Sequence, residues 1–418
     1  MTRPGRRWLA AVLATAGVAG LCLAPSASAA PAAWVPTLPV QQQARQQLSA
    51  MPDGTSYVLD VGSLISLYRG SQHGMVWDPV TYLPPSPTGF LEIRFGTASL
   101  GYAADLERLH RTTDGARTWS KLAGPPLPRG HQLYATEVGT AVAGRVLALG
   151  GEVYGPPTEG CNEPISQSLF TSPDAGRTWR RANLPRDTGI SSITYLDDRT
   201  AVILAYTYRP DPGQTFGPCT RLGDRNAVYV THDGGRTLRL AASCGGRVQL
   251  CTSAAFADRQ NLIVGRNNGT TFASRDGGRT FAPGPTLTNP AGARGLEQDS
   301  WFWVGGLDFI GATGYATTKL GGTFRTDDMG RTWTREASCD SGFSLGIGEV
   351  QMFDRNRAIA GGPSCVATRV GGGESRQSSA RPSLPAATGP VWTATAGASR
   401  VSMLPNGSVV RRLVPRHR

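Results

Sequence analysis

One eight-residue pattern recurs five times in this chain, and it constrains the fold more than any other feature. Each copy reads Ser/Thr-x-Asp-x-Gly-x-Thr-aromatic, except that Ala116 replaces the glycine of the first copy and Leu238 replaces the aromatic residue of the third. The copies begin at Thr112, Ser172, Thr231, Ser274 and Thr326. A pattern repeated along one chain indicates a repeat architecture, in which every copy belongs to one equivalent structural unit.

Two degenerate copies, at residues 70–77 and 368–375, extend the series to seven. The seven starts lie 42 to 60 residues apart, which suits one four-stranded propeller blade per unit. Short β-branched and aromatic runs separate the turn residues, and no long stretch has helical periodicity. The sequence therefore predicts an all-β fold, a single β-propeller of seven four-stranded blades, with six to eight as the permitted range.

The residue types of the pattern suit a tight hairpin turn. The Asp carboxylate can accept backbone N–H groups inside the turn, and the Gly position favours a positive φ, so Ala116 implies a small distortion. The closing aromatic side chain can pack between sheets and bury about 200 Å². We therefore assign a structural role to the aspartates and the closing aromatic residues of the pattern. Calcium binding is the weaker alternative, because one carboxylate per turn supplies too few ligands for a calcium ion. The residues assigned the structural role are Asp114, Asp174, Asp233, Asp276, Asp328, Trp119, Trp179 and Trp333.

These motifs resemble the Asp-box, or bacterial neuraminidase, repeat over roughly residues 57–368. Families that carry it include sialidases, some endoglucanases, the sortilin ectodomain and the photosystem II assembly factors. The resemblance implies that each turn joins the third and fourth strands of a blade, on the rim away from the central ligand site. It also implies that the five aspartates have no catalytic role.

A sialidase activity would require further residues. That family carries an arginine in a Phe/Tyr-Arg-Ile-Pro motif, two more arginines and a Tyr–Glu pair, and this sequence has no such motif. The nearest string, Ile93-Arg94-Phe95, is out of pattern. The consecutive boxes look more like the assembly-factor and sortilin-type propellers, which bind proteins or peptides.

The N-terminus has the pattern of a secretory signal at residues 1–29. Arg3, Arg6 and Arg7 precede an apolar run that ends in small residues, and export by either the Sec or the twin-arginine route is open. Leu21 before Cys22 does not fit a lipobox, so we expect a secreted protein without a lipid anchor or a stable membrane insertion.

The formal net charge is +12, and it falls to +9 without the three arginines of the leader. A basic secreted protein can adhere to anionic wall polymers or acidic glycans, although scattered and solvated arginines are the favoured explanation of the charge. Nucleic acid is not an expected partner, because no basic run is interleaved with aromatic residues.

Six cysteines follow the leader, and an even number in an exported chain favours disulfides. Proximity along the chain suggests the pairs Cys161–Cys219, Cys244–Cys251 and Cys339–Cys365, among fifteen possible connectivities. The cysteines lack zinc-type spacing and the histidines do not cluster, so we expect no metal and no cofactor.

The remaining segments divide into a lead-in, the propeller and a loop. We expect an irregular lead-in at residues 30–53, the propeller at 54–418 and a flexible Gly/Ser/Pro-rich loop at 371–390. The strand-like C-terminal piece is predicted to join the N-terminal strands in one blade and so close the ring. Binding faces usually lie on loops, and the candidates here are Glu163, Tyr208, Arg209, Trp301 and Trp303.

Two functions remain open at this stage. The first is a monomeric, non-catalytic extracellular propeller that binds a protein, a peptide or a glycan of the cell envelope. The second is a glycoside hydrolase, sialidase-like or of another kind, acting at the central funnel; it would require two carboxylates in one pocket. The candidates that the sequence offers outside the repeated turns are Glu163, Asp308, Asp340 and Glu349.

Overall fold

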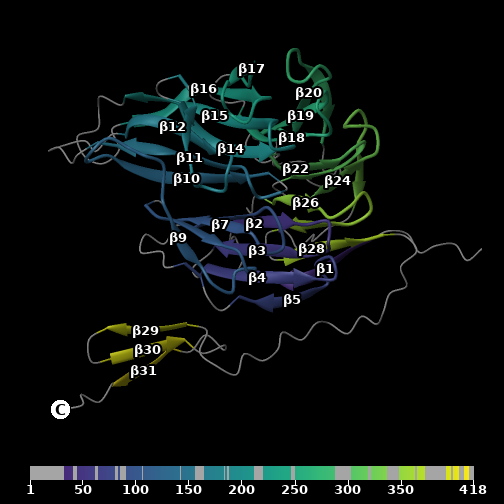
Figure 1. Cartoon of the computed structure of the whole chain (residues 1–418). Helices are drawn as coiled ribbons and strands as arrows, with labels where there is room; N and C mark the ends of the chain where they lie inside the picture. The colour runs from purple at the N-terminus through teal and green to yellow at the C-terminus, as the bar shows by residue number, and fades with distance from the viewer. Residues whose placement is uncertain are drawn as a thin grey trace, which may run out of the picture.

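The structure is a computed structural model in which seven four-stranded antiparallel sheets form a β-propeller, as predicted (Figure 1). It describes residues 33–371 except 41–44, 62–64, 81–82, 85–90, 106, 142, 156–163, 183, 186–187, 211–219, 246–249, 288–302, 319–321, 337–347 and 363–364. It also describes 392–396, 399–403 and 409–413. None of the described residues is helical, so no described helix could cross a membrane.

Six blades each consist of four consecutive strands, with the first strand innermost. Blade 1 contains β2 (Arg45–Ala50), β3 (Ser56–Val61), β4 (Ile65–Ser71) and β5 (Val76–Pro79). Blade 2 contains β6 (Glu92–Phe95), β7 (Gly101–Ala104), β8 (Leu109–Thr112) and β9 (Ser120–Leu122). Blade 3 contains β10 (Gln132–Thr140), β11 (Leu147–Tyr154), β12 (Pro164–Ser172) and β13 (Arg180–Ala182).

Blades 4 to 6 repeat this order. Blade 4 contains β14 (Thr188–Tyr195), β15 (Ala201–Pro210), β16 (Thr220–Thr231) and β17 (Arg239–Ser243). Blade 5 contains β18 (Cys251–Phe256), β19 (Leu262–Arg266), β20 (Thr270–Ser274) and β21 (Ala282–Thr286). Blade 6 contains β22 (Val304–Ile310), β23 (Thr313–Thr318), β24 (Thr323–Thr326) and β25 (Thr334–Glu336).

Blade 7 closes the ring with strands from both ends of the propeller. Its inner strands are β26 (Val350–Met352), β27 (Ala358–Gly361) and β28 (Cys365–Val370), and its outermost strand is β1 (Ala33–Pro39). β1 runs antiparallel to β28, from the pair Ala33 and Val370 to the pair Pro39 and Cys365.

Two expectations about the chain ends were wrong. The segment 30–53 contains β1 and β2 instead of an irregular lead-in. The C-terminal strands do not join the N-terminal strands in one blade but form a sheet of their own, which consists of β29 (Trp392–Ala396), β30 (Ser399–Met403) and β31 (Val409–Leu413). The two prolines of β1 resemble a loop, but the outermost strand of a sheet needs N–H donors on one side only and therefore tolerates them.

The apolar core is divided among the interfaces between blades. Seven buried clusters each combine side chains of two neighbouring blades, and together they account for all seven interfaces. Between blades 7 and 1, for example, Leu38 and Ile359 pack with Leu48, Val58 and Trp77. Each blade is therefore stabilised mainly by its neighbours, as expected for a repeat fold.

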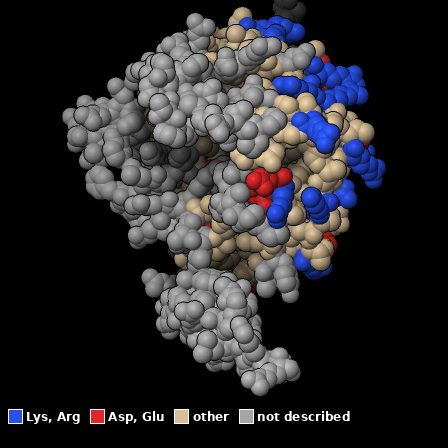
Figure 2. Space-filling view, turned by 90° about the vertical axis from the view of Figure 1, so that its left-hand side faces the viewer, with Lys and Arg blue, Asp and Glu red and all other residues tan. Residues whose placement is uncertain are grey.

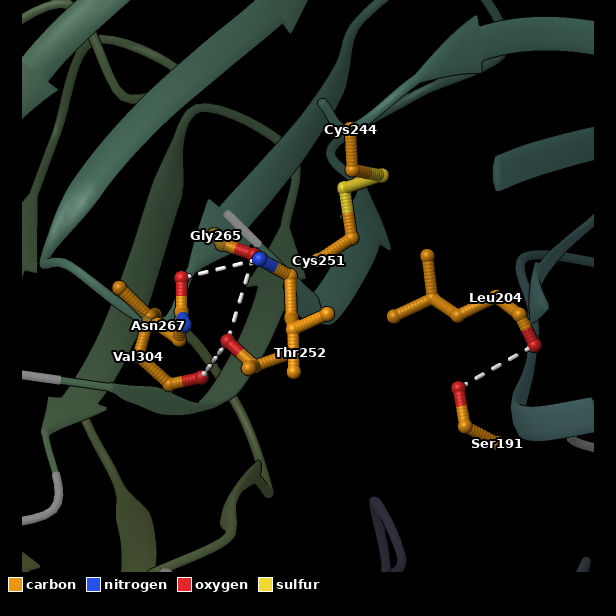
Figure 3. Close-up of a disulfide and its surroundings, with 9 residues drawn as sticks. Ser191, Leu204, Cys244, Cys251, Thr252, Gly265, Asn267 and Val304 are labelled. Carbon is orange, nitrogen blue, oxygen red and sulfur yellow. Dashed lines mark hydrogen bonds between the residues drawn. A yellow bond between two sulfur atoms is a disulfide. The ribbon is translucent and has the colours of Figure 1, made fainter. Parts of the chain in front are cut away.

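A disulfide links blades 4 and 5 in addition to their apolar contacts. Cys244, just after β17, is bonded to Cys251 at the start of β18, with the two Cα atoms 5.6 Å apart (Figure 3). This is the pairing that proximity along the chain suggested, and it fastens the crossing from blade 4 to blade 5. Cys161, Cys219 and Cys339 lie outside the described residues, and only the backbone of Cys365 is described.

Because β1 is the strand that closes blade 7, its removal should open the ring. We expect a chain beginning at residue 41 to lose cooperative thermal unfolding, whereas a chain ending at residue 371 should keep the melting temperature of the full propeller. Circular dichroism of the two truncated proteins against temperature checks this. Closure through the C-terminal strands would give the reverse result.

Candidate binding channel

The five repeated turns, which we call the acidic turns, share one hydrogen-bond network. In blade 6, Asp328 Oδ1 accepts the Thr326 hydroxyl (2.7 Å) and the Thr332 N–H (2.9 Å), and Oδ2 accepts the Thr332 hydroxyl (2.6 Å). Thr326 Oγ1 in turn accepts the Gly330 N–H at 2.9 Å. The same four bonds occur around Asp114, Asp174, Asp233 and Asp276.

The backbone of each acidic turn requires two left-handed residues, where the sequence predicted one. Both positions after the aspartate have a positive φ, and Ala116, Ala175 and Met329 adopt it as well as the glycines. The first of these positions also donates its N–H to the hairpin between strands one and two of the same blade, as Met329 does to the Ala312 carbonyl at 2.9 Å. The acidic turns are therefore fixed to their own blades, where they join the third and fourth strands of each sheet.

The aromatic residue that closes each acidic turn is half-buried against the preceding blade. Trp119 packs into the core between blades 1 and 2, Trp179 into that between blades 2 and 3, and Trp333 into that between blades 5 and 6. The Trp179 indole also donates to the Ala123 carbonyl at 3.1 Å. These side chains thus connect neighbouring blades.

The geometry of the acidic turns favours ionised carboxylates. The Thr178 backbone N–H and hydroxyl, the largest causes, lower the pKa of Asp174 to about 2, and the Thr118 hydroxyl and N–H do the same for Asp114. The five turns lie in five separate blades, so their carboxylates share no site. Among the described residues, no group of three or more His, Cys, Asp or Glu side chains is placed to hold a metal ion.

The residues with the features of a binding site lie instead on the propeller axis. A cavity of about 720 Å³ is lined by the innermost strand of every blade, from β2, β6, β10, β14, β18, β22 and β26. Its wall is rich in Ser and Thr and carries four charged side chains, Arg94, Glu137, Asp308 and Glu349. We call this cavity the channel.

Arg94 and Glu349 form a clamp in the channel where the ring closes. The Arg94 guanidinium donates to both carboxylate oxygens of Glu349, each at 2.9 Å, and also to the Leu48 carbonyl at 3.2 Å. Glu349 Oε2 accepts the Leu48 N–H at 2.8 Å. Burial lowers the pKa of Arg94, but the Glu349 carboxylate raises it by a larger amount. The pKa of Arg94 is therefore above its ordinary value, and Arg94 stays charged. The clamp joins blades 7, 1 and 2.

Asp308 is the second distinctive group of the channel. Its Oδ2 accepts the Met352 N–H of blade 7 at 2.7 Å, and its Oδ1 accepts the Phe309 N–H at 2.9 Å. Burial raises the pKa of Asp308 to about 7, against the effect of these two hydrogen bonds. At neutral pH this carboxyl is therefore distributed between its protonated and ionised forms.

β-Bulges place hydroxyl groups at equivalent points of the wall. The register shifts in the inner strands of blades 3, 4 and 5, and the Thr136, Ser191 and Thr252 hydroxyls donate to carbonyls of the second strand at 3.3–3.5 Å. Thr252 also donates to the Val304 carbonyl of blade 6 at 2.8 Å (Figure 3). The hydroxyls therefore satisfy carbonyls that the bulges leave without a ladder partner.

Of the predicted binding-face residues, only Trp303 has a described side chain, and it does not line the channel. Glu163 and Trp301 lie outside the described residues, and Trp303 is a partly exposed residue before β22. Tyr208 and Arg209 lie on β15 near its hairpin to β16, with only their backbones described. Of the carboxylates named from the sequence, Asp308 and Glu349 line the channel and Asp340 is outside the described residues.

Sequence reasoning missed Arg94 and Glu137 as channel residues. The signal was available, because each lies within the first strand of a unit, where a charged side chain needs a partner if it is to be buried. Arg94 was noted only as a failed match to a sialidase motif.

Solved structures share this fold at low sequence identity. YCF48 bound to D1 peptide matches with 13% identity over 81% of this chain and 96% of its own, with a TM-score of 0.51. YCF48 from Cyanidioschyzon merolae matches with 12% identity over 81% and 98%, with a TM-score of 0.50. The extracellular domain of BT4673 from B. thetaiotaomicron matches with 10% identity over 81% and 40%, with a TM-score of 0.51.

A scan against protein-family models gave no match, and neither did a search of curated proteins. At these identities the structural similarity establishes the class, a seven-bladed β-propeller, and nothing more specific. The function has to be argued from the residues of this chain.

The acidic-turn network predicts a measurable loss of stability when one aspartate is removed. Asp328→Ala deletes three accepted hydrogen bonds at a mostly solvated site, so we expect a cost of about 1 kcal/mol in the free energy of unfolding. Denaturant titration measures it, with Asp78→Ala, an exposed carboxylate of β5 outside any acidic turn, as the matched control. Equal effects of the two substitutions would contradict the assigned role.

Asp308 predicts an unusual pH dependence of stability. In the unfolded chain this carboxyl ionises near its ordinary pKa of 3.8, but in the folded protein it ionises only near 7. Its contribution to stability is therefore lost as the pH rises from about 4 to about 7. We expect Asp308→Asn to flatten that decline in denaturant titrations at pH 5 and 7.5, and an unchanged slope would refute the shift.

Proposed function

We propose that this chain is a secreted, non-catalytic propeller that binds a protein or peptide segment in its channel. The observation that carries the proposal is the channel itself, where every blade contributes polar groups to one cavity while the repeated acidic residues stay outside it. The proposed compartment is extracellular, in agreement with the leader pattern at residues 1–29 and the Cys244–Cys251 disulfide.

The charges of the channel favour a particular kind of segment. Three carboxylates face one guanidinium, and the guanidinium is engaged by Glu349. With three carboxyl groups against one guanidinium, the described wall of the channel carries more acidic than basic groups, in a protein that is basic overall. A ligand that presents an ammonium or guanidinium group, together with backbone donors for the Ser and Thr hydroxyls, has the complementary chemistry. YCF48 bound to D1 peptide is an example of a peptide complex on the same fold.

Selection of peptides tests the proposal. A phage-displayed library of 12-residue peptides is panned on the folded full-length chain, and enriched peptides are synthesised and titrated by calorimetry. We expect the enriched sequences to carry Lys or Arg, and the double substitution Glu137→Gln with Asp308→Asn to weaken binding at least tenfold. Asp198→Asn, an exposed carboxylate between β14 and β15, is the control that should leave affinity unchanged. Enrichment of no peptide, or equal losses in both variants, would overturn the proposal.

A glycoside hydrolase is the second candidate, because Asp308 and Glu349 line one cavity and differ in character. Asp308 can carry a proton near neutral pH, whereas Glu349 accepts two hydrogen bonds from the Arg94 guanidinium. Such a difference between two carboxyl groups is the arrangement that acid and base roles require. Release of a fluorophore from sialosides or glucosides by the wild type, abolished in Asp308→Asn, would favour this candidate over binding alone.

A further inference from the structure

A second repeated residue accompanies the acidic turns, although their hydrogen bonds do not need it. Three residues after each aspartate stands an arginine with an exposed side chain: Arg117, Arg177, Arg236, Arg279 and Arg331. Arg279 and Arg331 fold back and donate to the carbonyls of Asp276 and Asp328. Within the described part of the chain, the side chains of the other three form no hydrogen bond or ion pair, so their charges face solvent.

In blades 2, 3 and 4 the outermost strand continues this positive charge. Lys121 of β9, Arg180 and Arg181 of β13, and Arg239 of β17 are all exposed. We call these four residues, together with the turn arginines of the same blades, the basic rim. Figure 2 shows Lys and Arg gathered along one border of the described surface, with few Asp or Glu among them.

The acids within the basic rim are already engaged. Residues 112–122, 172–182 and 231–243 contain seven cations but only three carboxylates, Asp114, Asp174 and Asp233. Each of these carboxylates accepts the hydrogen bonds of its own turn. The excess positive charge therefore recurs once per blade along the outer edge of the ring, at equivalent positions.

A groove lies beside the basic rim, between blades 2 and 3. It has a volume of about 420 Å³, and Arg108, Lys121 and His131 line it together with Glu107. Its apolar lining includes Leu109, Leu122, Leu133 and Leu149. The Trp179 indole, which follows the acidic turn of blade 3, is bonded to the carbonyl of Ala123 in the groove wall and so couples the rim to the groove.

We propose that the basic rim and this groove bind a linear polysaccharide that carries a carboxylate on most of its sugar rings. The planar guanidinium matches a carboxylate through two parallel hydrogen bonds. Cations that recur from blade to blade fit a polymer whose anionic groups also recur. The leucine-lined groove suits the apolar C–H face of a sugar ring, with Lys121 and Arg108 placed for its carboxylate.

This surface is independent of the channel. The channel is acidic and lies on the innermost strands, whereas the basic rim lies on the outermost strands of three blades. Nucleic acid fits less well, because the aromatic residues between the cations of the basic rim, Trp119 and Trp179, are half-buried against the preceding blades and so present little face for base stacking.

Binding of polygalacturonate, measured by calorimetry at about 50 mM and 200 mM salt, tests the inference. We expect the triple variant Arg177→Gln, Arg180→Gln, Arg181→Gln to bind at least tenfold more weakly than the wild type, with a smaller loss of affinity on adding salt. The control is Arg279→Gln, Arg331→Gln, Arg355→Gln, which removes the same charge from exposed positions of blades 5, 6 and 7 and should change affinity less than twofold.

Three outcomes would overturn the proposal. The first is an equal loss in both triple variants, which would mean that net charge alone attracts the polymer. The second is equal binding of fully methyl-esterified polygalacturonate, which has the same backbone without carboxylates. The third is equal affinity for duplex DNA or a poly(glycerol phosphate), which would show adhesion to any polyanion. Circular dichroism confirms that the variants, all changed at exposed side chains, are folded.

Discussion

The inner edge of each innermost strand is the constraint on which the rest of this structure depends. A strand at a sheet edge leaves a row of N–H and C=O groups without ladder partners, and in a propeller these rows all converge on the axis. In the described blades, side chains of one blade accept some of the edge N–H groups of the next blade. Gln47 and Ser49 of blade 1 accept the Ile93 and Phe95 N–H groups of blade 2, and Asp308 of blade 6 accepts the Met352 N–H of blade 7.

The polar character of the channel follows from that requirement. Side chains that satisfy an edge must be polar and must lie on or near the axis, and every blade brings a polar side chain into the same cavity, which in blade 2 is the Arg94 guanidinium. At the ring closure the requirement is met by a pair: Glu349 accepts the Leu48 N–H while Arg94 donates to the Leu48 carbonyl. The groups that complete the scaffold are thus the same groups that a ligand entering the channel would meet, so recognition and ring closure cannot be changed independently.

The fold could be predicted from the sequence because one turn recurs in it. Most of the site could not be predicted, because the channel residues do not recur. The acidic turns predicted an all-β propeller and its seven blades, and short spacing predicted the Cys244–Cys251 bridge. The closing strand β1 was missed because its prolines imitate a loop, and the pairing that permits them lies more than 320 residues away in β28. Glu349 could be named as a carboxylate, but its partner Arg94 could not, since the two meet only after the ring closes.

The repeat therefore requires the same residues in every blade, whereas the function depends on residues that differ between blades. A turn that must recur in every blade tolerates little variation in its hydrogen-bonded positions, and the aspartate and the threonine four residues after it are the same in all five copies. The position between the left-handed residues and the threonine contributes its backbone N–H to the turn, as Arg279 does to Asp276 at 2.8 Å, yet its side chain is arginine in all five copies. The hydrogen bonds of the turn do not require that side chain, because those of Arg117, Arg177 and Arg236 form no hydrogen bond or ion pair in the described structure. We attribute these exposed side chains of blades 2 to 4 to what the outer surface contacts, just as we attribute the acids of the channel to what enters it, whereas Arg279 and Arg331 donate to the carbonyls of their own turns.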